Sequence, residues 1–202
     1  MAQIILTSLQ ESGPLFTLDF SSIRLTAAEF EHLCRDNQDL RLELTSNGEL
    51  IVMPPTGSKT GLRNASLTRQ LVAWAENDGE GVAFDSSTGF TLADGAILSP
   101  DASWVRRERW EALTEEEREG FAPLCPDFVI ELRSHGNPLK PLQGKMEEYI
   151  RNGAQLGWLI DPLKRRVYIY RTLEKVELLS DSATVSADPL LRGFELQLTE
   201  LW

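Results

Sequence analysis

The chain contains few of the residues that build disulfide frameworks and structural metal sites. Its 202 residues include two cysteines, Cys34 and Cys125, and two histidines, His32 and His135. The cysteines are far apart in sequence and form no Cys-x-x-Cys pair, so neither a disulfide framework nor a structural zinc site is expected. Any metal bound here is expected to serve function and not to hold the fold together.

Long apolar runs and an excess of positive charge are also missing. No apolar run approaches the roughly 20 residues that span a bilayer, and residues 1–10 have no positive segment before their apolar residues. We therefore expect a cytoplasmic protein with no membrane contact. The formal net charge of −11 opposes strong sequence-independent attraction to a polyanion, because that attraction depends on Lys and Arg. Any contact with DNA is therefore expected to be local.

The composition that remains is that of a globular protein, with 42% hydrophobic and 25% charged residues. A chain of this length buries roughly 70% of its unfolded surface on folding, so a core forms without disulfides or metal. No linker, repeat or low-complexity segment interrupts the sequence. We expect a single domain over residues 1–202.

Turn, capping and periodicity signals predict alternating helices and strands. Thr26 with Glu29, and Thr114 with Glu117, have the spacing of capping boxes at helix N-termini. We predict helices over residues 26–37, 62–77, 110–119 and 139–152, a loop over residues 56–61, and strands over residues 41–46, 49–53, 81–84, 90–92, 96–105, 126–133, 155–160 and 166–170. This pattern predicts an α/β fold.

Asn47-Gly48 separates two extended runs and predicts a β-hairpin. A two-residue loop at this point pairs Leu44 with Ile51 on one face of the hairpin. Glu43 then lies on the opposite face, where it is available to a polar site.

Two predicted strands carry acidic residues on a polar face. Asp101 alternates with apolar neighbours in one strand, while Asp127, Glu131 and Arg133 share a face of the other. The helix that follows the second strand has an apolar stripe, and Lys145 lies at the edge of this stripe. We expect Lys145 to lean toward the sheet.

The Asp101 and Glu131 carboxylates suit a divalent cation. Charged groups within a covered sheet are costly unless they are paired or bind metal, and oxygen ligands favour Mg²⁺ or Mn²⁺. A cation that lowers the pKa of bound water, together with a Lys or Arg, can cleave a phosphodiester. Lys145 suits water activation because burial can lower its pKa, whereas Arg133 stays protonated and suits an electrostatic clamp. Both cations remain candidates.

These residues resemble a known family. Ser99-Pro100-Asp101, followed thirty residues later by Glu131-x-Arg133, resembles the PD-(D/E)XK nuclease superfamily, with arginine in place of the motif's lysine. The resemblance extends to the bacterial Uma-type family of restriction-endonuclease-like proteins over about residues 40–165. It rests on the ordered motifs Leu42-Glu43-Leu44, Gly48-Glu49-Leu50, Met53-Pro54-Pro55, Ser99-Pro100-Asp101, Pro126-Asp127-Phe128-Val129-Ile130-Glu131, Lys145, Tyr149, Gly153, Trp158 and Asp161-Pro162.

The resemblance implies a restriction-endonuclease-like α/β core, with a mixed central sheet flanked by helices. It implies metal ligands at Asp101 and Glu131, a supporting acid at Glu43, and a catalytic lysine on the following helix, which here is Lys145. The implied activity is Mg²⁺- or Mn²⁺-dependent cleavage of DNA. A homodimer is one assembly that suits such an enzyme, since nucleases that cut both strands often pair two subunits.

Other interpretations of these residues stay open. Asp101 also suits a turn cap, and Glu131 suits a salt bridge to Arg133 on the same face. Turn chemistry accounts for Asp127 and Asp85, and His135 is a weaker candidate for a proton shuttle. The alternative function is an inactive nuclease-fold binding or assembly module, which the acidic net charge and the displaced lysine favour.

Overall fold

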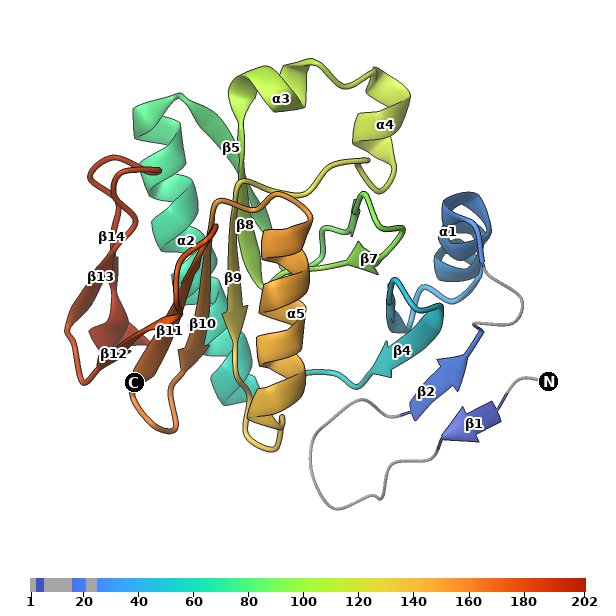
Figure 1. Cartoon of the computed structure of the whole chain (residues 1–202), viewed down its shortest axis with the longest axis horizontal. Coiled ribbons are helices and arrows are strands. Elements are labelled where there is room, and N and C mark those ends of the chain that lie inside the picture. The colour runs from blue at the N-terminus through green and yellow to red at the C-terminus, as the bar shows by residue number, and fades with distance from the viewer. Residues whose placement is uncertain (1–2, 6–15, 21–24) are drawn as a thin grey trace.

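The computed structural model describes residues 3–5, 16–20 and 25–202. Within these residues the strands form two six-stranded sheets and one two-stranded sheet (Figure 1). We name the sheet with the order β12-β11-β10-β9-β8-β5 the central sheet, and the sheet with the order β1-β2-β4-β3-β7-β6 the N-terminal sheet. The chain passes from the N-terminal sheet to the central sheet between β4 and β5, returns between β5 and β6, and passes to the central sheet again between β7 and β8.

The central sheet is mixed. β9 and β10 are parallel, and the other neighbouring strands are antiparallel. Helix α5 (Leu139–Arg151) connects β9 to β10, since parallel neighbours need a crossover connection. The strands of this sheet are β5 (Gly81–Asp85), β8 (Ala102–Arg106), β9 (Phe128–Leu132), β10 (Leu156–Asp161), β11 (Arg166–Arg171) and β12 (Glu177–Ser180).

Helices cover both faces of the central sheet (Figure 1). On one face, Phe128 of β9 packs in the same buried cluster as Leu67 of α2 (Ser58–Asp78). On the other face, Val129 packs in a second buried cluster with Met146 of α5. The alternation that the sequence predicts for this strand is therefore observed, because successive side chains point to opposite faces.

The C-terminal segment completes the layer that contains α2. Its side chains Leu191 and Phe194 are buried in the same cluster as Trp158, and the Phe194 ring stacks on the Trp158 ring at a centroid distance of 6.0 Å. This segment comprises β13 (Thr184–Ser186), β14 (Glu195–Gln197) and the 3-10 helix η1 (Leu198–Glu200).

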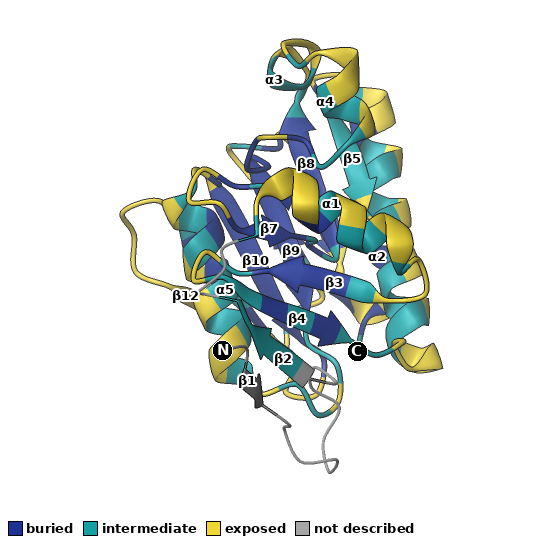
Figure 2. Cartoon of the chain, turned by 90° about the vertical axis from the view of Figure 1, so that its right-hand side faces the viewer, coloured by how far each residue is buried: buried dark blue, intermediate teal, exposed yellow. Residues whose placement is uncertain are grey.

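The N-terminal sheet lies beside the central sheet, with α1 (Ala27–Asp36) against it (Figure 2). Phe30 of α1 packs with Leu42 and Val52 in a separate buried cluster. The predicted capping box at Thr26 is confirmed. The strands of this sheet are β1 (Gln3–Ile5), β2 (Phe16–Asp19), β3 (Arg41–Leu44), β4 (Glu49–Met53), β6 (Phe90–Thr91) and β7 (Ile97–Leu98).

The predicted β3–β4 hairpin forms, but its predicted register is wrong by one residue. Leu44 pairs with Leu50 and not with Ile51. The Thr45 amide still donates to the Glu49 carbonyl oxygen, so the loop has the three residues 46–48, and the φ of 83° at Gly48 lies in the left-handed region that glycine tolerates. The hydroxyl of Thr45 accepts a hydrogen bond from the Glu49 amide and stabilises this longer loop. Glu43 nevertheless lies on the face predicted for it, because its leucine neighbours pack against α1.

Three other predicted elements have different bounds. The strand predicted over residues 96–105 is two strands, β7 and β8, which belong to different sheets. Helix α2 begins at Ser58, inside the predicted loop. The helix predicted over residues 110–119 is two short helices, α3 (Arg107–Glu111) and α4 (Glu115–Glu119), and the second has the predicted capping box at Thr114.

The predicted fold class is confirmed, since a mixed sheet lies between helices. Among the helices of the described residues, none has both the length and the apolar character that a membrane crossing requires.

Candidate active site

Asp101 lies where the chain leaves the N-terminal sheet and enters the central sheet. Its Oδ2 accepts a hydrogen bond of 2.8 Å from the Leu132 amide, and its Oδ1 accepts one of 3.0 Å from Nδ2 of Asn64. The antiparallel register of β8 and β9 pairs Ala102 with Ile130, so its extension places Asp101 opposite Glu131. The two acids predicted from separate strands are therefore neighbours.

Glu131 is buried at the end of β9, with 4% of its surface exposed. The hydroxyl of Tyr149, on α5, donates a hydrogen bond of 3.2 Å to its Oε1. Burial raises the pKa of Glu131, the ammonium of Lys145 lowers it, and the carboxylates of Asp101 and Glu43 raise it; together these effects raise this pKa to about 7. This carboxylate is therefore close to the balance between its neutral and charged forms at neutral pH.

Lys145 reaches from α5 between two carboxylates. Its Nζ lies 2.8 Å from Oε1 of Glu43 and 2.8 Å from Oε1 of Glu131. Burial by itself lowers the pKa of Lys145, but the carboxylates of Glu131 and Glu43 outweigh burial and hold this pKa above its ordinary value. The side chain is therefore an ammonium ion. The expectation that burial lowers its pKa is wrong, because two anions lie in contact with it.

Glu43 brings the N-terminal sheet into this cluster. It is 3% exposed, and its Oε1 accepts a hydrogen bond of 3.0 Å from the Ser99 amide in addition to the contact with Lys145. Arg41 lies two residues before Glu43 and shares its face of β3. Nη2 of Arg41 is 3.9 Å from Oδ1 of Asp101. The strand β3 thus supplies both a carboxylate, from Glu43, and a guanidinium, from Arg41, to the same site.

Arg133 does not join the cluster around Lys145. Its Nη1 lies 2.7 Å from Oδ2 of the fully buried Asp161, and its Nε donates to the carbonyl oxygen of Asn137. The prediction that strand parity brings this guanidinium to the site is wrong. Arg133 lies one residue beyond the end of β9, and its side chain forms an ion pair with Asp161 of β10. Lys145 is therefore the cation that contacts Glu131.

Asp127 is also outside the cluster. Its Oδ2 lies 2.9 Å from Nη1 of Arg109 and accepts a hydrogen bond from the Arg106 amide, at the opposite end of β9 from Glu131. Asp85 accepts hydrogen bonds from the amide and hydroxyl of Ser87, in agreement with a turn role. His135 is exposed in the loop between β9 and α5.

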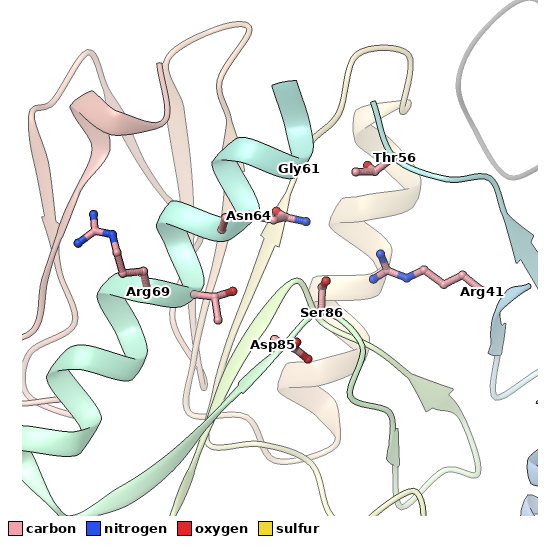
Figure 3. Close-up of a pocket in the computed structure, with 9 residues that line it drawn as sticks. Arg41, Thr56, Gly61, Asn64, Arg69, Asp85 and Ser86 are labelled. Atoms are coloured by element: carbon pink, nitrogen blue, oxygen red, sulfur yellow. The ribbon is translucent and has the colours of Figure 1, made fainter. Parts of the chain in front are cut away.

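A polar cleft of about 360 Å³ (Figure 3) is lined in part by Arg41 and Asn64, both of which lie close to Asp101. Its walls come from α2, from the turn after β5, and from Arg41 and the segment that follows β4. Arg41 and Asn64 point toward each other across the opening (Figure 3). The lining residues are Arg41, Thr56, Gly61, Asn64, Ala65, Thr68, Arg69, Asp85 and Ser86.

The sequence interpretation did not assign Tyr149, Asn64 or Arg41 to the site. Tyr149 carried a usable signal, because it lies one helical turn after Lys145 on the predicted buried stripe. Arg41 also carried one through its spacing from Glu43. Asn64 carried none, since its partner Asp101 is 37 residues away in a different element.

The donor set of the cluster fits a cation held by few protein ligands. Among residues 3–5, 16–20 and 25–202, no group of three or more His, Cys, Asp or Glu side chains is arranged to hold a metal ion. Magnesium typically takes one or two carboxylates and completes its shell with water and phosphate oxygens. The neighbouring Asp101 and Glu131 meet that requirement. Together with Glu43 they are three carboxyl groups beside one ammonium group, that of Lys145.

Glu131 is expected to make the protein less stable as pH rises from about 4.5 to about 7. Its ordinary pKa is 4.5 and its pKa in the fold is about 7. Between these values the folded protein retains a proton that the unfolded chain has lost, so stability falls as pH rises. Glu131→Gln removes this titration and should flatten the curve. Urea unfolding at a series of pH values measures the effect, and equal slopes for both proteins would contradict it.

The fold and the site together define a restriction-endonuclease-like protein. A mixed sheet between helices carries Asp101 and Glu131 at the ends of adjacent strands, with Lys145 in contact with Glu131.

The family Uma2, described as "Putative restriction endonuclease", matches residues 27–199, so the chain belongs to this family. A solved structure with a similar fold is described as a putative nuclease belonging to DUF820 from Anabaena variabilis. It is 21% identical, with a TM-score of 0.72 over 88% of this chain and 97% of that chain. None of the curated proteins matches the chain. The family supports a nuclease-like function, and the structural neighbour shows that the fold is shared.

Proposed function

We propose that the protein is a metal-dependent DNA endonuclease whose site comprises Asp101, Glu131 and Lys145. The observation that carries this proposal is the contact of 2.8 Å between Nζ of Lys145 and Glu131, beside Asp101. Acids alone at adjacent strand ends would suit many roles. Their combination with a buried ammonium ion suits chemistry in which negative charge develops on a phosphoryl group.

In this proposal Asp101 and Glu131 would hold Mg²⁺ or Mn²⁺, with Glu43 as a supporting acid. The bound ion supplies a water of lowered pKa and neutralises phosphate charge. Lys145 stabilises the negative charge of the transition state through its ammonium group. It does not act as the base that takes a proton from water, because its raised pKa keeps it protonated. Tyr149 fixes the orientation of Glu131 through its hydroxyl.

Cleavage assays of the Asp101→Ala variant test this function. The wild-type protein should nick or cut plasmid and oligonucleotide DNA in Mg²⁺ or Mn²⁺ and lose this activity in EDTA. Asp101→Ala should abolish cleavage, since it removes a metal ligand and the acceptor of the Leu132 amide. Asp36→Ala is the matched control, because Asp36 is exposed at the end of α1, outside both the carboxylate cluster and the lining of the cleft. Full activity in Asp101→Ala would refute the assignment.

An inactive binding or assembly module is the second candidate, favoured by the contact of Lys145 with two carboxylates, which already balances part of their charge. It predicts no thermal shift with Mn²⁺ and no cleavage of single-stranded, duplex or branched DNA.

Cleavage of both strands of a duplex would need two sites, which is the reason to expect a homodimer for the active enzyme.

A further inference from the structure

Two residues that line the cleft, Arg41 and Asn64, each have a buried polar atom without a hydrogen-bond partner among the described residues. In the described part of the chain, Nε of Arg41 and Oδ1 of Asn64 are buried and have no hydrogen-bond partner. Buried polar groups are normally satisfied, so each such atom indicates water or a ligand. Both residues line the same cleft, and their side chains point toward each other across it (Figure 3).

The orientation of the Asn64 amide follows from its neighbour. Nδ2 of Asn64 donates to Oδ1 of Asp101, and a carboxylate accepts hydrogen bonds but does not donate them. The amide nitrogen is therefore directed at Asp101, and the buried amide oxygen is the acceptor that has no partner within the protein as far as the structure describes it. A ligand of this cleft must offer a donor to Asn64 and an anionic acceptor to Arg41.

The charge of the cleft differs from that of the whole chain. Arg41 is the cation directed across the opening, while Arg69, at the other end, lies 2.6 Å from Glu200. The acidic residue of the lining, Asp85, accepts hydrogen bonds from the amide and hydroxyl of Ser87 in its own turn. A local positive group beside a hydrolytic site on a chain of net charge −11 is where a polyanion can make contact.

We infer that this cleft binds one nucleotide of the DNA strand next to the bond that is cut, with its phosphate on Arg41 and a base N–H group on Asn64. The volume of about 360 Å³ is in the range of small-ligand sites. The hydroxyl groups of Thr56, Thr68 and Ser86 line the same space and provide neutral contacts for the sugar and phosphate. This inference rests on the proposed function and adds the path of the substrate strand.

The inference predicts different effects for the two residues. Arg41→Gln should weaken DNA binding about ten-fold or more, since a hydrogen bond to a charged group is worth about 1.5–3 kcal/mol. It should also reduce the slope of log affinity against log salt by about one, as loss of a phosphate contact does. Asn64→Ala should weaken binding without changing the salt slope, because its contact is neutral.

Fluorescence anisotropy with a labelled 20-nucleotide DNA, single-stranded and duplex, measures both quantities in Ca²⁺ and in EDTA at several salt concentrations. Arg63→Gln is the matched control, because it removes the same charge from α2 outside the cleft lining and should leave affinity and slope unchanged. Arg41→Lys keeps the charge but lacks Nε, so it should retain the slope and lose affinity. Thermal unfolding of each variant checks that the fold persists.

The outcomes separate this inference from the proposed function. Wild-type affinity and salt slope in both Arg41→Gln and Asn64→Ala, or no DNA binding by the wild-type protein, would overturn the inference. Metal-dependent cleavage that is lost in Asp101→Ala would still support the proposed function in that case. The reverse result, binding that depends on Arg41 without cleavage under any metal condition, would support the cleft and refute the nuclease.

Discussion

Lys145→Gln is expected to lower DNA cleavage about 100- to 1000-fold, the usual cost of losing one group that stabilises transition-state charge. The ammonium of Lys145 is the cation in direct contact with Glu131. Glutamine keeps part of the side-chain volume but has no charge to oppose a phosphoryl group. Single-turnover cleavage at saturating enzyme measures the loss without interference from product release.

Lys140→Gln is the matched control for this prediction, since Lys140 is an exposed lysine of the same helix. It should cleave as the wild-type protein does. A Mn²⁺-dependent thermal shift should persist in Lys145→Gln and disappear in Asp101→Ala, which distinguishes loss of chemistry from loss of the metal or of the fold. Cleavage by Lys145→Gln within ten-fold of wild type would remove Lys145 from the mechanism.

Arg133→Gln is expected to lower the free energy of unfolding by about 3 kcal/mol while leaving cleavage by the folded protein nearly unchanged. Asp161 is fully buried, and Arg133 is its ion-pair partner at 2.7 Å. Removal of one partner leaves a buried charge uncompensated, which typically costs 3–5 kcal/mol. Urea unfolding measures the stability, and cleavage at a temperature well below the midpoint measures the activity.

The double variant Arg133→Gln with Asp161→Asn tests the pairing itself. Asp161 accepts a hydrogen bond of 3.1 Å from the Leu163 amide, and asparagine keeps an oxygen that can accept it. Asparagine also removes the unpaired negative charge. The double variant should therefore be more stable than Arg133→Gln alone, as coupled residues require. If Arg133→Gln lost cleavage but kept normal stability, the assignment of Arg133 to a structural ion pair would be wrong, and Arg133 would have a role in catalysis.

The acidic part of the site was predictable from the sequence because it depends on local periodicity. Alternation along β9 places Glu131 opposite the apolar residues, and the helical stripe of α5 places Lys145 toward the sheet. Neither inference needs knowledge of the fold. The same alternation failed for Arg133, since its direction depends on Asp161, a partner 28 residues away on another strand.

The errors in the elements also have physical causes. Pro100 was a visible signal against a continuous strand over residues 96–105, because proline has no N–H for a ladder. The hairpin register depended on the hydrogen bond that the Thr45 hydroxyl accepts from the Glu49 amide, which favours three loop residues over two. The early start of α2 had no capping signal, since Gly57 supplies no side-chain cap. This error did not affect Asn64, which lies inside the predicted helix and was missed because its partner Asp101 is 37 residues away.

The junction between the two sheets has a consequence for how a new chain acquires its site. The Glu43–Lys145 contact joins residues 102 positions apart, and Asn64–Asp101 joins residues 37 positions apart. Contacts of such long range form late, because loop closure costs entropy before the contact is made. During synthesis, the ribosome releases both Glu43 and Asp101 well before Lys145. If the chain cuts DNA as proposed, a nascent or half-folded copy lacks the cation of its site until α5 has docked.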